Sequence, residues 1–145
     1  MLGPSANLLR RALAVLERDE LRAFTHLSEA LGRLRLVMDV DGERFRVIGG
    51  GRPRIEIDDA SPAEVRVTTV RAAIVDLIDG ETSFLDAVLA RRIRITGDSF
   101  DLLQVARAQR AFTEGAVRAR RLRPLLDELR SAPTAAPPRR RRQAG

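Results

Sequence analysis

The chain has 145 residues, of which 44% are hydrophobic and 32% are charged, a composition typical of one globular domain. It contains no cysteine, which excludes disulfides, thiolate nucleophiles and zinc–cysteine sites. No apolar run approaches the roughly 18 residues that span a bilayer, and arginines interrupt the first apolar stretch. We therefore expect a cytoplasmic protein that is not exported by a signal peptide.

The net charge of +6 is concentrated near the C-terminus. Most of it comes from four consecutive residues, Arg139, Arg140, Arg141 and Arg142. Residues 1–138 hold 22 basic and 20 acidic side chains and are therefore nearly neutral. Residues 132–145 are too rich in proline and charge to pack, which predicts a disordered tail. The tail is either a solvated cluster or an electrostatic tether to an anionic membrane, and RNA or an acidic protein would attract the same arginines.

Apolar residues recur at helical spacing from about residue 7 to residue 31, with a charged break at residues 18–20. This pattern predicts either one long helix or two short ones, ended by Gly32. We treat residues 1–32 as an N-terminal helical segment that precedes the main domain.

Four runs of alternating apolar and polar residues follow, at residues 34–40, 44–47, 54–58 and 65–69. Asp41-Gly42 lies between the first two runs and is the typical signal of a type I′ hairpin turn. The four runs predict a meander in which each strand has one apolar and one charged face. Such a sheet is covered on one side only.

The helical period then returns and predicts two short helices in series, over residues 70–78 and 84–89. Ile93 and Ile95 alternate with polar residues, which predicts a short fifth strand. The chain therefore changes from helix to strand and back within a few residues.

Asp98 is a suitable N-cap, with the acidic Asp101 at the third helical position, so we expect a helix that begins near Ser99. Pro124 can occupy the first turn of one further helix. These two helices complete the predicted domain.

Residues that usually carry catalysis or hold metals are sparse. His26 is the only histidine, and Ser28, two positions along the helix, does not face it. The acidic residues 39–43 lack the glycine and glutamate positions of a calcium loop, and no helix follows the glycine-rich residues 49–51 as a phosphate loop requires. We therefore expect no catalytic residues, no metal and no cofactor. Five phenylalanines without tyrosine or tryptophan leave little for base stacking, so we expect no specific nucleic-acid binding.

Three stretches carry a resemblance to a known family, namely AEVRVTT at residues 63–69, IVDLIDG at residues 74–80 and FLDAVLARRIRITGD at residues 84–98. They resemble the sterol carrier protein type 2 (SCP-2) family, with its short helix, basic step, alternating Ile or Val, and Gly-Asp before the closing helix. The chain departs from the family pattern at Arg91, where members often have glycine. The resemblance implies an α+β fold over residues 33–131, a five-stranded, mainly antiparallel sheet with one face covered by helices.

The resemblance also implies a function without catalysis, the binding or transfer of a sterol, fatty acyl or isoprenoid lipid in an apolar tunnel between sheet and helices. The residues expected to line that tunnel are Ile74, Leu77, Ile78, Phe84, Leu85, Val88, Leu89, Ile93, Ile95, Leu102, Val105 and Phe112. Arg92 and Arg94 would point to solvent.

Other readings of the same residues stay open. The apolar positions would equally suit a filled core with no cavity. The fold could serve an accessory protein that contacts an enzyme complex and binds no lipid, or the basic tail could bind nucleic acid. The expected partners are a hydrophobic small molecule or lipid, an anionic membrane contacted transiently by the tail, and an enzyme.

Overall fold

The structure of the protein is a computed structural model, which describes residues 2–131. Within these residues, helices and strands follow one another in the order α1 (Pro4–Asp19), α2 (Leu21–Leu31), β1 (Arg35–Val40), β2 (Glu43–Ile48), β3 (Arg54–Ile57), β4 (Val65–Thr69), α3 (Arg71–Ile78), α4 (Phe84–Leu89), β5 (Arg94–Thr96), α5 (Ser99–Arg118), η1 (Arg120–Leu122) and α6 (Arg123–Ser131). The tail arginines at 139–142 lie outside the described residues. Every helix within residues 2–131 is too short or too polar to span a bilayer.

The N-terminal apolar stripe forms two helices rather than one. The break falls at Glu20, whose backbone angles (φ −138°, ψ 62°) are not helical. Glu43 of β2 holds the start of α1, because its carboxylate accepts hydrogen bonds from the backbone N–H groups of Ser5 and Ala6, both at 2.9 Å. The first N–H groups of a helix have no partner within the helix and favour a carboxylate. This contact therefore joins α1 to the sheet.

The predicted hairpin between β1 and β2 is confirmed. Asp41 and Gly42 both have positive φ, 53° and 86°, as a type I′ turn requires. The register places Leu36 opposite Val47 and Met38 opposite Phe45, so one face of the hairpin is apolar. That face turns toward the helices.

The predicted four-strand meander is wrong at β4. The strand order is β3-β2-β1-β4-β5, and β4 pairs with β1 in parallel instead of following β3. Residues 58–64 cross the outer face of the sheet to make this connection. Arg46 of β2 lies beneath them with only 2% of its surface exposed. Its Nε donates to Asp58 at 3.0 Å, and its other nitrogens donate to the carbonyls of Ser61 and Pro62.

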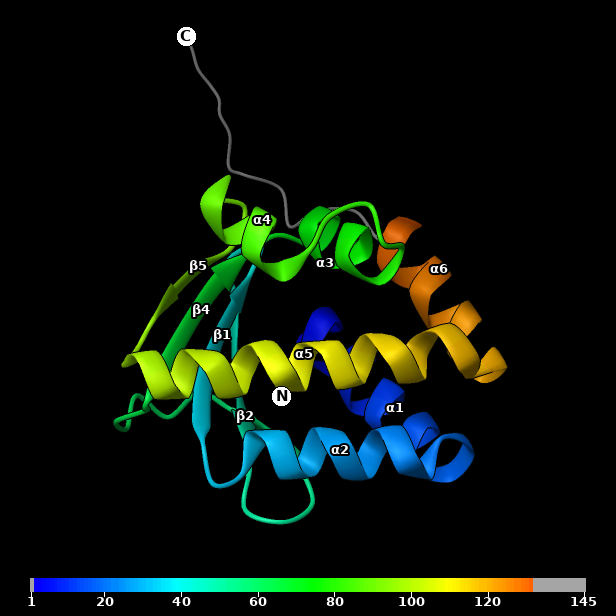
Figure 1. Cartoon of the computed structure of the whole chain (residues 1–145), viewed down its shortest axis with the longest axis horizontal. Coiled ribbons are helices and arrows are strands. Elements are labelled where there is room, and N and C mark those ends of the chain that lie inside the picture. The colour runs from blue at the N-terminus through cyan, green and yellow to red at the C-terminus, as the bar shows by residue number, and fades with distance from the viewer. Residues whose placement is uncertain (1, 132–145) are drawn as a thin grey trace, which may run out of the picture.

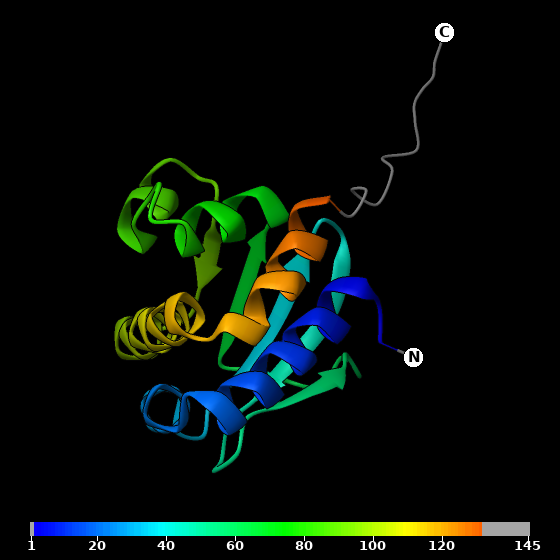
Figure 2. The ribbon, with the colours of Figure 1, turned by 90° about the vertical axis from the view of Figure 1, so that its right-hand side faces the viewer.

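The other strand pairs, β1–β2, β2–β3 and β4–β5, are antiparallel, so the prediction of a mainly antiparallel five-stranded sheet is confirmed. Figure 1 and Figure 2 show the helices gathered on one side of this sheet, with α1 and α6 running across it. The long α5 packs along α2. The core therefore lies between one face of the sheet and a layer of helices.

The helix boundaries in the second half of the chain follow the predicted signals. The short helices α3 and α4 occur in series, as expected. Helix α5 begins at Ser99, and the carboxylate of Asp98 accepts from the backbone N–H of Asp101 at 2.9 Å. Pro124 is the second residue of α6.

Candidate ligand cavity

Two apolar spaces, here called chambers, lie on the helical face of the sheet. The first has a volume of about 80 Å³ and lies between α1, the hairpin, α3 and α6. Its walls are Ser5, Leu8, Leu9, Ala12, Met38, Val40, Phe45, Ile74, Ile78, Phe112, Leu122, Leu125, Leu126 and Leu129. The only side-chain heteroatoms among them are the Ser5 hydroxyl and the Met38 sulfur.

The second chamber is larger, about 160 Å³, and lies beside the first under α2 and α5. Its walls include Leu13, Leu27, Leu31, Leu36, Val47, Val67, Leu77, Phe84, Ile93, Val105 and Ala108. The two chambers share Leu9, Met38 and Phe112. These three side chains therefore lie where the chambers adjoin, and together they are here called the partition.

A groove on the outside leads toward the second chamber. It has a volume of about 560 Å³ and lies between α4 and α5. Leu77, Phe84 and Gln109 line both the groove and the second chamber. The groove and the second chamber therefore adjoin at these three residues.

Polar groups concentrate at the groove rather than in the chambers. Gln109 Nε2 donates to Thr113 Oγ1 at 2.7 Å, and both residues line the groove together with Arg110 and Glu114. Inside the second chamber, the hydroxyl of Thr69 is already used, because it donates to the Arg92 carbonyl at 3.0 Å. The interior can therefore take an apolar group, while hydrogen bonds to a head group are available at the mouth.

The rim of the groove is apolar and exposed. Leu85 and Leu103 line the groove with 64% and 49% of their surface exposed, and Phe100 at the start of α5 is 69% exposed. Large apolar side chains that remain in water at the edge of a groove often mark a binding surface.

The predicted lining residues fall into these three spaces with one exception. Ile74 and Ile78 line the first chamber, Leu77, Phe84, Ile93 and Val105 line the second, and Phe112 lines both. Leu85, Val88, Ile95 and Leu102 line the outer groove. Leu89 lies apart from all three spaces, with 72% of its surface exposed.

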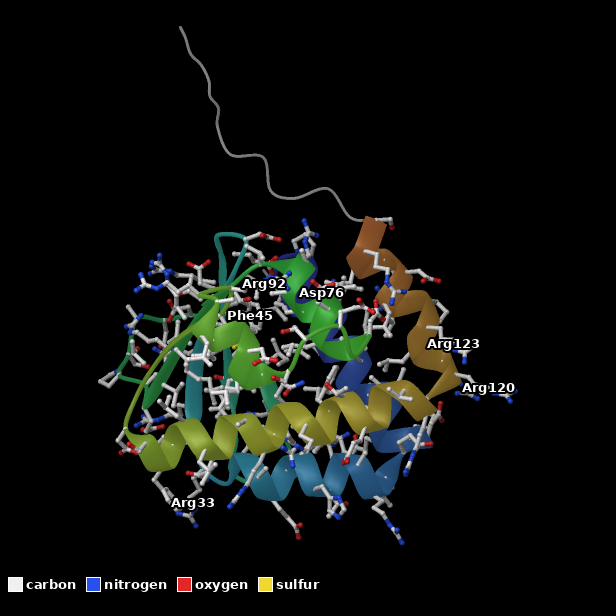
Figure 3. All side chains as sticks on the ribbon, turned by 45° about the horizontal axis from the view of Figure 1, so that its top comes forward. Arg33, Phe45, Asp76, Arg92, Arg120 and Arg123 are labelled. Atoms are coloured by element: carbon white, nitrogen blue, oxygen red, sulfur yellow. The ribbon has the colours of Figure 1, made fainter. Side chains whose placement is uncertain are left out.

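Arg92 and Arg94, both expected to point to solvent, differ in their exposure. Arg94 is exposed on the outer face of the sheet. Arg92 is half-buried, and its Nη2 lies 2.7 Å from Asp76 Oδ2 of α3, a pair labelled in Figure 3. This ion pair ties the end of α4 to α3 beside the second chamber. Within residues 2–131, no group of three or more His, Cys, Asp or Glu side chains is placed to hold a metal ion.

Sequence reasoning missed the walls that come from the first and last helices. Leu8, Leu9 and Leu13 of α1 and Leu125 and Leu129 of α6 all face the chambers. The helical spacing of these residues was recognised in the sequence. Such spacing identifies an apolar face but does not predict which part of the chain packs against it. The contact between Glu43 and the start of α1 is one long-range link between α1 and the sheet.

No family model and no curated protein matches this sequence. Solved structures do resemble it. The sterol carrier protein domain 2 of Helicoverpa armigera aligns over 76% of this chain and 86% of its own, with 20% identity and a TM-score of 0.54. The apo form of sterol carrier protein 2 from Yarrowia lipolytica aligns over 74% of this chain and 88% of its own, with 12% identity and a TM-score of 0.51. The chain has the SCP-2 fold.

The recognition from three short stretches is thus confirmed at the level of fold. A further structure with the SCP-2 fold, described as "UbiJ-SCP2 Ubiquinone synthesis protein", aligns over 59% of this chain and 73% of its own, with 15% identity and a TM-score of 0.48. That score is too low to support an argument about shared partners.

Proposed function

We propose that the protein binds a hydrophobic ligand without chemical conversion and carries it in the chambers between sheet and helices. The observation that supports this most is that neighbouring apolar spaces share lining residues. Leu77 and Phe84 line both the groove and the second chamber, and Met38 lines both chambers. Two structures of the same fold are themselves named as sterol carrier proteins.

The binding step is partition from water into an apolar site. Burial of apolar surface is worth about 25 cal/mol per Å², and no bond is made or broken. The mouth would hold the polar end of the ligand, where Gln109, Arg110 and Thr113 offer hydrogen-bond donors. A carboxylate or hydroxyl head group matches these donors.

The size of the chambers favours a slender ligand. Each chamber is smaller than the roughly 300 Å³ at which pockets for compact small molecules begin. A flexible fatty acyl or isoprenoid chain can pass the partition at Leu9, Met38 and Phe112, whereas a rigid sterol would require the helices to move apart. We therefore place the acyl or isoprenoid chain ahead of the sterol.

The decisive experiment is native mass spectrometry of the purified full chain, followed by organic extraction of whatever remains bound. We expect one lipid per protein, or uptake of oleic acid when it is added to the empty protein. A protein that stays at its bare mass with oleic acid, isoprenoid alcohols and cholesterol would contradict ligand binding.

Matched variants locate the ligand. Ala108 is buried on α5 against the second chamber, while Ala106 of the same helix lines the outer groove. Ala108→Leu should fill the chamber and abolish uptake of oleic acid with the fold intact. Ala106→Leu adds the same volume and should slow uptake without preventing it. Ala14→Leu, at an exposed position of α1, is the neutral control.

We also propose a cytoplasmic location for the protein and a transient contact of its tail with an anionic membrane. The residues of this contact are Arg139, Arg140, Arg141 and Arg142. An accessory role in an enzyme complex predicts a stable protein partner and no bound lipid. The mass measurement above separates that role from ligand binding.

A further inference from the structure

A cluster of exposed arginines lies at one end of the molecule, where the α1–α2 junction meets the end of α5. The cluster, here called the basic end, consists of Arg18, Arg22, Arg118, Arg120, Arg121 and Arg123. Gly115 of α5 packs directly on Leu16 of α1 and Ala23 of α2, and Arg121 Nε lies 3.5 Å from Asp19 Oδ2, which joins the two segments. Figure 3 shows Arg120 and Arg123 projecting from this end, far from Arg33.

The basic end carries the positive charge of the described body. Three of the acidic residues within four positions of these six arginines in the sequence are Asp19, Glu20 and Glu114. The described residues hold 22 arginines and 20 acidic side chains in all, so 16 and 17 remain outside this set. Among the described residues, Arg121 alone of the six has an ion-pair partner, Asp19. A local excess of unpaired arginine attracts a polyanionic surface.

Two exposed aliphatic side chains stand among these arginines. Leu21 at the start of α2 is 62% exposed, and Val117 near the end of α5 is 66% exposed. Arginine mixed with exposed aliphatic residues suits the interface of an anionic bilayer, where the aliphatic groups enter the acyl boundary. Nucleic acid fits less well, because base stacking needs aromatic faces, and the nearby Phe24 is buried.

The basic end also borders the candidate ligand cavity. Leu122, between Arg121 and Arg123, is fully buried and lines the first chamber. The segment that carries the arginines on its outside therefore closes the chamber on its inside. A lipid surface docked here would lie directly against a wall of the cavity.

We propose that the basic end docks the protein on a bilayer containing anionic phospholipid. The proposal does not depend on a ligand in the chambers or on the C-terminal tail, so each can fail alone. Near such a surface, each arginine contributes about 1 kcal/mol, which is roughly a fivefold factor in the partition coefficient.

The test compares two triple variants of the full chain by vesicle sedimentation. One is Arg118→Gln, Arg120→Gln and Arg123→Gln at the basic end. The other is Arg33→Gln, Arg66→Gln and Arg94→Gln, which removes the same charge from exposed positions elsewhere. The vesicles are phosphatidylcholine with and without phosphatidylserine, at ~0.15 M salt.

We expect the basic-end triple to bind phosphatidylserine vesicles at least tenfold more weakly than the unchanged chain, while the control triple changes binding less than threefold. A pair of changes, Leu21→Asn with Val117→Asn, should weaken vesicle binding with all charges retained. Equal losses in both triples, or no loss in either, would overturn the proposal. So would binding of poly(U) RNA that needs the basic end when vesicles are ignored. Uptake of oleic acid is measured on every variant and should not change.

Discussion

Gly115 shows how closely the helices approach one another. It lies inside α5, where a Cβ would stand 2.7 Å from the Leu16 side chain and 2.9 Å from the Cβ of Ala23. The Leu16 tip can rotate away, but the Cβ of Ala23 moves only with its backbone. Three helices therefore meet at a position that has room for hydrogen alone.

Gly115→Ala should destabilise the protein, against the usual trend in helices. Alanine normally favours a helix over glycine by about 1 kcal/mol, yet overpacking here should produce a net loss of about 1–3 kcal/mol. Urea unfolding measures the free energy. Ala23→Gly in the same chain removes the clash, so the double variant should lose less than the two single losses together. A stabilised Gly115→Ala would show that the contact between α2 and α5 is looser than described.

At the scale of elements, Arg35, the first residue of β1, is linked to Glu64, the residue just before β4. Glu64 accepts from the Arg35 backbone N–H at 2.7 Å and from Arg35 Nε at 3.2 Å, and its own N–H donates to the Arg35 carbonyl at 3.2 Å. The hydrogen bond from the Arg35 side chain, with a further one from its backbone, lowers the pKa of Glu64 below its ordinary value. The carboxylate is therefore more stable in the folded chain than in the unfolded one.

A lowered pKa predicts acid sensitivity with a definite sign. The stabilisation is fully present above the unfolded pKa of about 4.3 and is lost as the pH falls through the lower folded pKa. Glu64→Gln should reduce the thermal midpoint at pH 7, and its difference from the unchanged chain should vanish as the pH drops below that range. Glu56→Gln, on the edge strand β3, is the charge-matched control. A gap that stays constant with pH would exclude the ion pair as its cause.

The crossover that Arg46 holds explains why the strand order escaped sequence reasoning. The alternation of apolar and polar residues correctly predicted that β4 is a strand. It does not predict which strand β4 pairs with. The choice was made by contacts between residues that are far apart in the chain, such as Arg46 Nε with Asp58 at 3.0 Å. From sequence alone, an arginine on the charged face of a strand is expected to be exposed to solvent. The sequence pattern does not show that a loop covers it.

For the whole molecule, the chambers couple ligand binding to stability. A ligand that binds only the folded chain at a concentration 100 times its Kd adds about 2.7 kcal/mol. For a domain of this size, that corresponds to a rise of about 10 °C in the thermal midpoint.

We expect oleic acid to raise the midpoint of the unchanged protein more than cholesterol does, since a chain fits the two small chambers. Ala108→Leu should lose this shift, because it fills the second chamber, and its own midpoint should not fall. Differential scanning fluorimetry measures all of these values. A larger shift with cholesterol would mean that the helices separate to admit a ring system.

The sequence by itself determined the local structure. The Asp41-Gly42 turn, the Asp98 cap and the change of period around Ile93 depend on a few neighbouring residues, and each was predicted and then observed. The lining of a cavity was expected only from the family resemblance, and only for the part that comes from residues 74–112. Local propensity contains no information about partners that lie far along the chain.

Only the tertiary structure decided which surfaces meet. It placed Leu9 of α1 and Leu129 of α6 on the chamber walls and left Leu89 in solvent, although all three have the spacing of a buried helix face. It also brought arginines from residues 18–22 and 118–123 to one end of a nearly neutral body. The physical reason is that burial and charge clustering arise from packing between distant segments, which hydrophobic periodicity does not encode.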